Sequence, residues 1–189
     1  MAAFPRALTM AHQLIRERLE KGDSAIDATV GNGHDTLFLE SCVGETGHVF
    51  GFDIQPEAIE AATKRIAEAG LENVTLSTES HADVAGHVSA PVKAAMFNLG
   101  YFPGGDKSII TRKSSTIAAL KSICDLGAKI ITIVVYHGHE GGDDEASAVI
   151  AWAESLDQTE FSVIRYGFIN QRNAPPFLVA IERKAARKT

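Results

Sequence analysis

The chain has 189 residues, of which 45% are hydrophobic, and it carries a formal net charge of −6. We expect one domain over residues 1–189, with no general affinity for nucleic acid, no membrane span and no visible signal peptide. Its two cysteines, Cys42 and Cys124, have no metal-ligand spacing. They indicate free thiols, a cytoplasmic location and no metal site.

Hydrophobic periodicity divides the chain into alternating helices and strands. The first helix is predicted over residues 5–20, where His12 shares the apolar face with Leu8, Ala11 and Ile15. Strands are predicted at residues 24–30, 47–53, 74–77, 93–98, 129–136, 161–169 and 177–182. Further helices are predicted at residues 35–42, 56–69, 108–125 and 142–155.

The connection between the last two predicted strands is short. Residues 170–175 cannot supply the dozen or more residues of a parallel crossover, so this pair should be antiparallel. The other strands alternate with helices, which favours a parallel sheet. We therefore predict an α/β fold with a seven-stranded, mostly parallel sheet, one antiparallel strand and an additional N-terminal helix. This is the Rossmann-like architecture of class I methyltransferases dependent on S-adenosylmethionine (SAM).

A glycine turn, Asp27-Ala28-Thr29-Val30-Gly31-Asn32-Gly33, follows the first predicted strand, and Asp53 ends the second. Glycines let the backbone approach a ligand, and the acid can accept both hydroxyls of a ribose. Thr36 stands where a dinucleotide fingerprint has its third glycine. Asp27 would repel a pyrophosphate but suits a cation, so the pattern favours SAM over a nicotinamide. The alternative is a tight turn with Asp27 as a local cap.

A second polar segment follows the fourth predicted strand. Asn98-Leu99-Gly100-Tyr101 resembles the D/N-P-P-Y motif of amino-group methyltransferases but lacks its prolines, which weakens the case for a base amine as acceptor. A primary alkylamine must lose a proton before it attacks a methyl carbon. Asp35 and His139 are the candidates to accept that proton. The alternatives are a helix N-cap for Asp35, a loop-ordering role for His139 and simple packing for Tyr101.

Residues 28–36, 98–107 and 136–142 resemble the YtqB-like rRNA methylase family of Gram-positive bacteria. The resemblance extends over nearly the whole chain, including residues 173–176. It implies SAM-dependent methylation of the 5-aminomethyl group of (2-thio)uridine at the tRNA wobble position. It also implies the tRNA anticodon stem-loop as partner, with a homodimer as a possible assembly. Ribosomal RNA and a small-molecule amine remain alternative acceptors. A nicotinamide oxidoreductase and a non-catalytic RNA-binding module are the alternatives from other classes.

The residue patterns and the resemblance together predict the site. The predicted catalytic residues are Asp35, Asn98, Tyr101 and His139. The predicted cofactor contacts are Asp27, Gly31, Asn32, Gly33, Asp35, Thr36, Asp53, Gln55, Ser80, His81 and Asn98, and no residue is predicted to bind a metal. The residues expected to face RNA are Lys107, Arg112, Tyr136 and His139. An extruded wobble base would stack on Tyr101, Phe102 or Tyr136.

Overall fold

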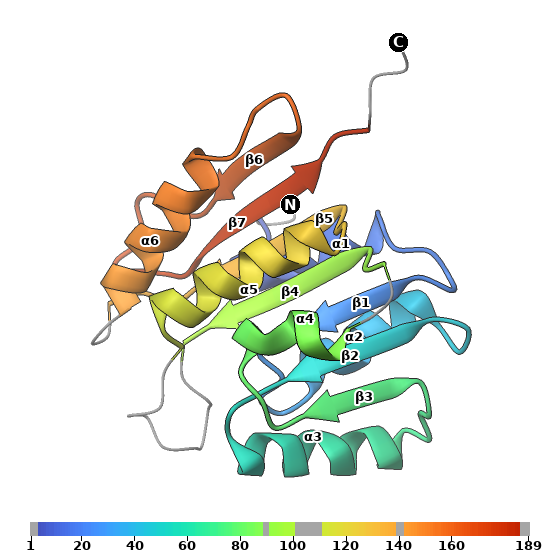
Figure 1. Ribbon diagram of the computed structural model, residues 1–189. Helices are drawn as coiled ribbons and strands as arrows, with labels where there is room; N and C mark the ends of the chain where they lie inside the picture. The colour runs from blue at the N-terminus through green and yellow to red at the C-terminus, as the bar shows by residue number, and fades with distance from the viewer. Residues whose placement is uncertain (1–3, 89–90, 101–110, 139–141, 186–189) are drawn as a thin grey trace.

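The computed structural model describes residues 4–88, 91–100, 111–138 and 142–185. Its strands form one seven-stranded sheet in the order β3-β2-β1-β4-β5-β7-β6 (Figure 1). The strands are β1 (Ser24–Asp27), β2 (His48–Phe52), β3 (Val74–Ser77), β4 (Ala94–Leu99), β5 (Ile130–Val135), β6 (Phe161–Tyr166) and β7 (Phe177–Arg183). Strands β1 to β5 pair in parallel, and β7 is antiparallel to both β5 and β6. The predicted fold, including its one reversed strand, is confirmed.

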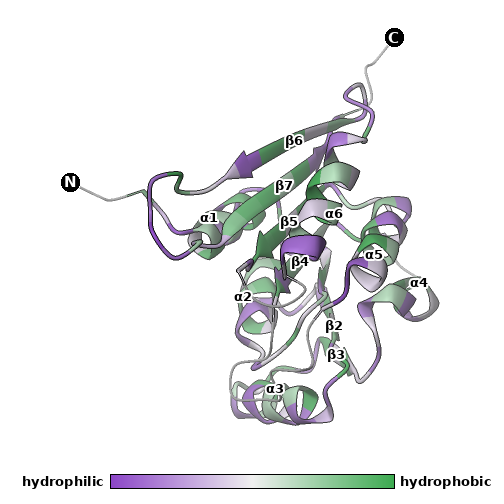
Figure 2. Cartoon of the chain, turned by 90° about the vertical axis from the view of Figure 1, so that its left-hand side faces the viewer, coloured by the Kyte–Doolittle hydropathy of each residue, from purple (hydrophilic) through white to green (hydrophobic). Residues whose placement is uncertain are grey.

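Helices cover both faces of the sheet. They are α1 (Ala7–Arg16), α2 (His34–Val43), α3 (Pro56–Glu68), the 3-10 turn η1 (His81–Asp83), α4 (Val84–His87), α5 (Lys113–Asp125) and α6 (Gly142–Glu154). Helices α1 and α2 lie on one side of the sheet and α4, α5 and α6 on the other (Figure 2). The sheet therefore has an apolar core on each face.

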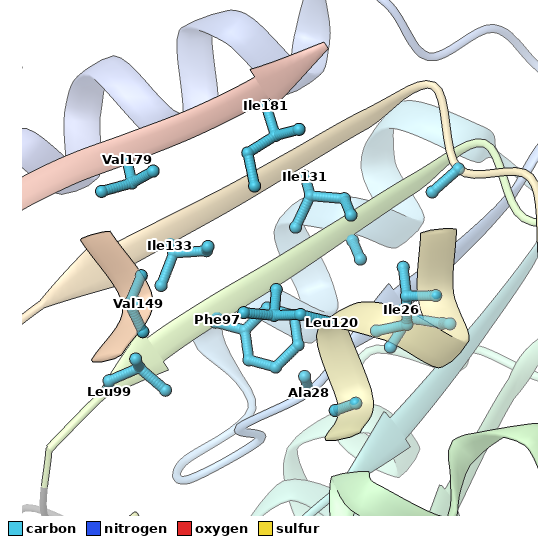
Figure 3. Packing of buried hydrophobic residues seen from close by; sticks show 14 of the residues in the cluster. Ile26, Ala28, Phe97, Leu99, Leu120, Ile131, Ile133, Val149, Val179 and Ile181 are labelled. Atoms are coloured by element: carbon cyan, nitrogen blue, oxygen red, sulfur yellow. The ribbon is translucent and has the colours of Figure 1, made fainter. Parts of the chain in front are cut away.

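The larger core lies between the sheet and the α4–α5–α6 layer. Figure 3 shows Leu120 of α5 and Val149 of α6 among side chains from β4, β5 and β7. Strand β5 contributes side chains to both cores, and all of its residues are buried. Isoleucine and valine suit such a strand because branched side chains pack well on a pleated surface. Strand β5 is therefore buried on both faces of the sheet.

The predicted and observed boundaries differ most near the loops. Strand β1 ends at Asp27 rather than at residue 30, because the chain bends at residues 28–29. The N–H groups of Ala28 and Val30 still donate to Met96 of β4 and Phe52 of β2. Helix α5 begins at Lys113, preceded by an extended Arg112. The 3-10 turn and α4 were not predicted, since segments this short show no periodicity.

Candidate active site

A cavity of about 620 Å³ opens beside the carboxyl ends of β1 and β4, where the strand order reverses. Open α/β sheets bind ligands at this switch point, and small-molecule sites commonly have volumes of this size. Its walls come from loops after several strands and from the end of β4. The sequence-predicted residues that line it are Gly31, Asn32, Asp35, Asp53, Gln55, Ser80, His81, Asn98, Arg112 and Tyr136.

The glycine turn forms one wall of the cavity. Gly31 and Gly33 have φ angles of +50° and +77°, which residues other than glycine rarely adopt. A Cβ atom on Gly33 would also lie 3.0 Å from the Cβ atom of Ala62 on α3. Arg65 of α3 donates from Nε to the carbonyl of Asn32 at 2.7 Å. Helix α3 therefore supports the turn from behind and fixes its backbone against the cavity.

Asp53 joins the loops that follow β1 and β2. Its Oδ2 atom accepts the backbone N–H of Gly31 at 2.9 Å, and its Oδ1 atom accepts that of Gln55 at 3.0 Å. Each carboxylate oxygen has a second lone pair. Asp53 can therefore hold the turn and still offer two acceptor positions to a pair of ligand hydroxyls, as a ribose requires.

Three predicted cofactor contacts lie outside the cavity lining: Asp27, Gly33 and Thr36. The side chain of Asp27 is buried beneath the turn, where it accepts the N–H of Thr29 at 3.1 Å and the hydroxyl of Thr36 at 2.6 Å. A direct contact between Asp27 and the ligand stays a prediction. Asp27 braces the turn from behind.

Burial, followed by the nearby charge of Asp35, raises the pKa of Asp27 to about 7. An aspartate in an unfolded chain titrates near 3.9, roughly. The folded protein thus binds an additional proton between these values, and the stability linked to it is lost as the pH rises through about 7.

We expect Asp27→Asn to weaken this dependence on pH. Ligand-free wild-type protein should lose more thermal stability than the variant between about pH 6 and about pH 8, because only the wild type acquires the buried charge. Thermal unfolding of both proteins across this range measures the difference. Parallel curves would show that Asp27 does not change its ionisation within this range.

Asp35 and Asn98 meet at the cavity wall. The Nδ2 atom of Asn98 donates to Oδ2 of Asp35 at 3.3 Å, and the backbone N–H of Asn98 donates to the hydroxyl of Thr29 at 2.7 Å. The side-chain oxygen of Asn98 has no hydrogen-bond partner among the described residues. Asp35 is not the N-cap of α2, because Gly33 holds that position. The helix-cap alternative is therefore wrong, and the carboxylate is directed to the site.

Sequence reasoning missed the third member of this group. His12 of α1 places Nε2 2.7 Å from Oδ1 of Asp35. The hydrophobic pattern put His12 on the apolar face of the first helix without assigning it a role. An imidazole among apolar neighbours was the available signal, but its partner is 23 positions away in the chain.

His81 and Ser80 follow β3. The Nδ1 atom of His81 lies 3.0 Å from the carbonyl oxygen of Ala28, to which it can only donate. Its Nε2 atom is then an acceptor, with no partner among the described residues. Burial lowers the pKa of His81, which favours this neutral form. The Ser80 hydroxyl accepts the N–H of Ala82 at 3.1 Å and thereby caps the 3-10 turn.

A buried carboxylate holds the residues at the rim of the cavity, where α5 begins. Glu145 of α6 accepts the hydroxyls of Thr111 at 2.5 Å and Thr116 at 2.6 Å. The backbone N–H of Thr111 also donates to the carbonyl of Gly100 at 3.2 Å. These contacts fix the start of α5, and with it Arg112 at the cavity. Sequence reasoning assigned no role to Glu145, which stands in the acidic first turn of α6.

Four predicted site residues lie outside the described part of the chain: Tyr101, Phe102, Lys107 and His139. Tyr136 is described, lines the cavity and is 40% exposed. Among the described residues, no group of three His, Cys, Asp or Glu side chains could hold a metal ion. Within the same ranges, no helix is both long and apolar enough to cross a membrane.

Comparison with known proteins identifies relatives over nearly the whole chain. The family model described as "Putative rRNA methylase" matches residues 49–182. The chloroplastic tRNA (mnm(5)s(2)U34)-methyltransferase of Arabidopsis thaliana is 36% identical over 193 aligned positions, which cover 95% of this chain and 70% of that protein.

Solved structures agree with these relatives. A protein described as a "putative rRNA-methylase" from Clostridium thermocellum superposes with a TM-score of 0.94 at 45% identity, covering 97% of this chain and all of that one. A protein described as a "putative methyltransferase" from Streptococcus mutans, solved in complex with SAH, has a TM-score of 0.87 at 35% identity, covering 96% of this chain and all of that one.

Proposed function

This chain belongs to the family described as "Putative rRNA methylase", and we propose that it methylates the 5-aminomethyl group of (2-thio)uridine at the wobble position of tRNA. SAM dependence follows from the family and from the relative solved with SAH. The choice of acceptor rests on one observation in particular. Asp53, which can accept hydrogen bonds from ribose hydroxyls, and the Asn98–Asp35 pair line the same cavity. A cofactor and an amine can therefore meet there.

The cavity suits a cationic cofactor with a ribose. Asp53 offers its two remaining acceptor positions to the hydroxyls, and the glycine turn leaves room for close approach. The carboxylate of Asp35 at the wall can face a cationic group of the cofactor. When bound, SAM supplies an electrophilic methyl group on a sulfonium.

The acceptor side suits an amine. The side-chain oxygen of Asn98 can accept an N–H of the substrate and so orient the nitrogen lone pair. Asp35, which accepts the amide N–H of Asn98, is placed to receive the proton that an alkylammonium must lose. A carbon acceptor carries no N–H or O–H group to donate to this pair.

Transfer RNA as the substrate is supported by the Arabidopsis relative. A wobble base lies in a single-stranded loop, so it can be extruded into a pocket at modest cost. At the rim, Arg112 can contact a phosphate and Tyr136 can stack on the base. The single domain, the cytoplasmic location and the homodimer stay predictions.

Two assays test this proposal. Purified protein with labelled SAM should methylate tRNA that carries 5-aminomethyl-2-thiouridine and leave tRNA lacking that group unlabelled. In the source organism, deletion of the gene should cause 5-aminomethyl-2-thiouridine to accumulate in digested tRNA, as measured by mass spectrometry.

Controls separate the alternative acceptors. The wild-type gene should restore the methylated nucleoside in the deletion strain, and the Asn98→Ala gene should not. Ribosomal RNA and free alkylamines are assayed in parallel. If either one is labelled and the tRNA of the deletion strain is unchanged, that molecule and not tRNA is the methyl acceptor.

A further inference from the structure

The N-terminal helix contributes a side chain to the acceptor site. Helix α1 packs on β5 and β7 through Ala7, Ala11 and Ile15. Leu8 lines the cavity, and His12 follows one helical turn later. Its Nε2 atom lies 2.7 Å from Oδ1 of Asp35, which is within the distance of a strong hydrogen bond.

The imidazole of His12 is held in a defined orientation. Its ring stacks on Phe38 of α2 with 3.9 Å between the centroids and 13° between the planes. The guanidinium of Arg16 lies 5.1 Å from the centroid of the same Phe38 ring. Asp35 precedes Phe38 by three residues on α2, so the stack and the hydrogen bond join the same two helices at neighbouring points.

The two oxygens of Asp35 have different partners. Oδ1 faces His12 and Oδ2 accepts from Nδ2 of Asn98. The second contact orients the amide of Asn98 so that its oxygen is left for another donor. With no partner at Oδ1, the carboxylate of Asp35 could rotate, and the orientation of Asn98 would be lost with it.

We propose that His12 is a positioning residue for methyl transfer: it donates from Nε2 to Asp35 and thereby orients Asp35 and Asn98 toward the acceptor amine. This inference rests on the proposed function. It assigns no contact between His12 and the substrate, because the imidazole is not part of the cavity lining. His12 acts through Asp35.

The chemical step begins at the substrate ammonium. One of its N–H bonds breaks and an O–H bond forms on Asp35. The lone pair freed on nitrogen attacks the methyl carbon of SAM and forms the new C–N bond. The bond between that carbon and the sulfonium sulfur breaks, and both of its electrons go to sulfur. The products are a methylated ammonium and a neutral thioether. Asp35 returns its proton to solvent after the product leaves.

Several charged groups surround Asp35 and must be considered in a pH profile. His12 faces it from α1, and Asp27 lies near it on β1. His34, its neighbour on α2, also lines the cavity. Arg16 reaches the Phe38 ring that stacks on His12. Asp27 has a pKa raised to about 7, so its titration is present in the wild type and in any His12 variant alike.

Two substitutions separate hydrogen bonding from packing. His12→Gln retains an N–H donor for Asp35 but loses the ring, whereas His12→Phe retains the ring on Phe38 but loses the donor. We expect His12→Phe to lower the single-turnover rate of methyl transfer by about 10- to 100-fold. Loss of a residue that orients a metal ligand has an effect of this size in metal sites. His12→Gln should keep clearly more of the rate. SAM affinity, measured by calorimetry, should be unchanged in both variants.

The pH profile supplies a second readout. Alkylamines lose their proton in water near pH 10, roughly, so the need for a well-oriented Asp35 falls as the pH rises. The defect of His12→Phe should therefore shrink between about pH 7 and about pH 9.5. Unfolding temperatures of both variants establish that the comparison is made between folded proteins.

The outcomes distinguish the two proposals. The reverse order, with His12→Phe active and His12→Gln impaired, would show that the ring only packs and would overturn the inference. A defect of equal size at every pH, or a parallel loss of SAM binding, would also overturn it. Wild-type protein that methylates no amine acceptor would instead overturn the proposed function, and the role of His12 with it.

Discussion

Asp53→Ala should weaken SAM binding by at least about 100-fold, since each hydrogen bond to a charged group contributes about 1.5–3 kcal/mol. The substitution removes both acceptor positions available to the ribose and both bonds to the backbone N–H groups of Gly31 and Gln55. The glycine turn would also lose the Gly31 bond that ties it to the loop after β2. Calorimetry with SAM and with SAH measures the effect directly.

A matched control is available elsewhere in the chain. Asp157 accepts the backbone N–H of the residue two positions on, Thr159, at 2.7 Å, as Asp53 does with Gln55. Asp157 lies outside the cavity lining. Asp157→Ala should therefore leave SAM affinity unchanged, while Asp53→Asn, which keeps one acceptor oxygen, should have an intermediate effect. Wild-type affinity in Asp53→Ala would show that the ribose binds elsewhere.

The second large effect concerns turnover rather than binding. Asn98→Ala should lower the rate of methyl transfer by about 100- to 1,000-fold, the cost of losing one well-placed polar group at a reaction centre. The variant removes the oxygen available to the amine and the donor that orients Asp35. Because Asp53 and the glycine turn are untouched, SAM affinity should change little. Single-turnover assays at saturating SAM separate the two quantities.

Asn73→Ala provides the comparison for Asn98→Ala. Asn73 donates from its side chain to the carbonyls of Gly44 at 2.9 Å and Gly47 at 3.1 Å, so its role is to hold a loop. The Asn73→Ala variant should be less stable than the wild type but should keep the wild-type rate of methyl transfer per folded molecule. Full activity in Asn98→Ala would mean that another group orients the acceptor.

Much of the fold was predictable because its signals are local. The glycine turn and Asp53 form a motif that is visible in the sequence. The short link at residues 170–175 allows only an antiparallel direction for β7. The site was less predictable. The contact of His12 with Asp35 and that of Glu145 with Thr111 depend on how neighbouring helices pack on the same face of the sheet, which no spacing in the chain encodes. Asp27 was identified by position, but only its burial shows that it braces the turn.

The reversed strand β7 has a consequence for how the protein is made. Strand β7 lies between β5 and β6, yet it is the last strand of the sheet to leave the ribosome. Until it arrives, β5 presents an unpaired edge of isoleucine, threonine and valine that can pair with other chains. A ribosome that stalls before Phe177 therefore leaves an aggregation-prone nascent chain rather than a smaller functional enzyme.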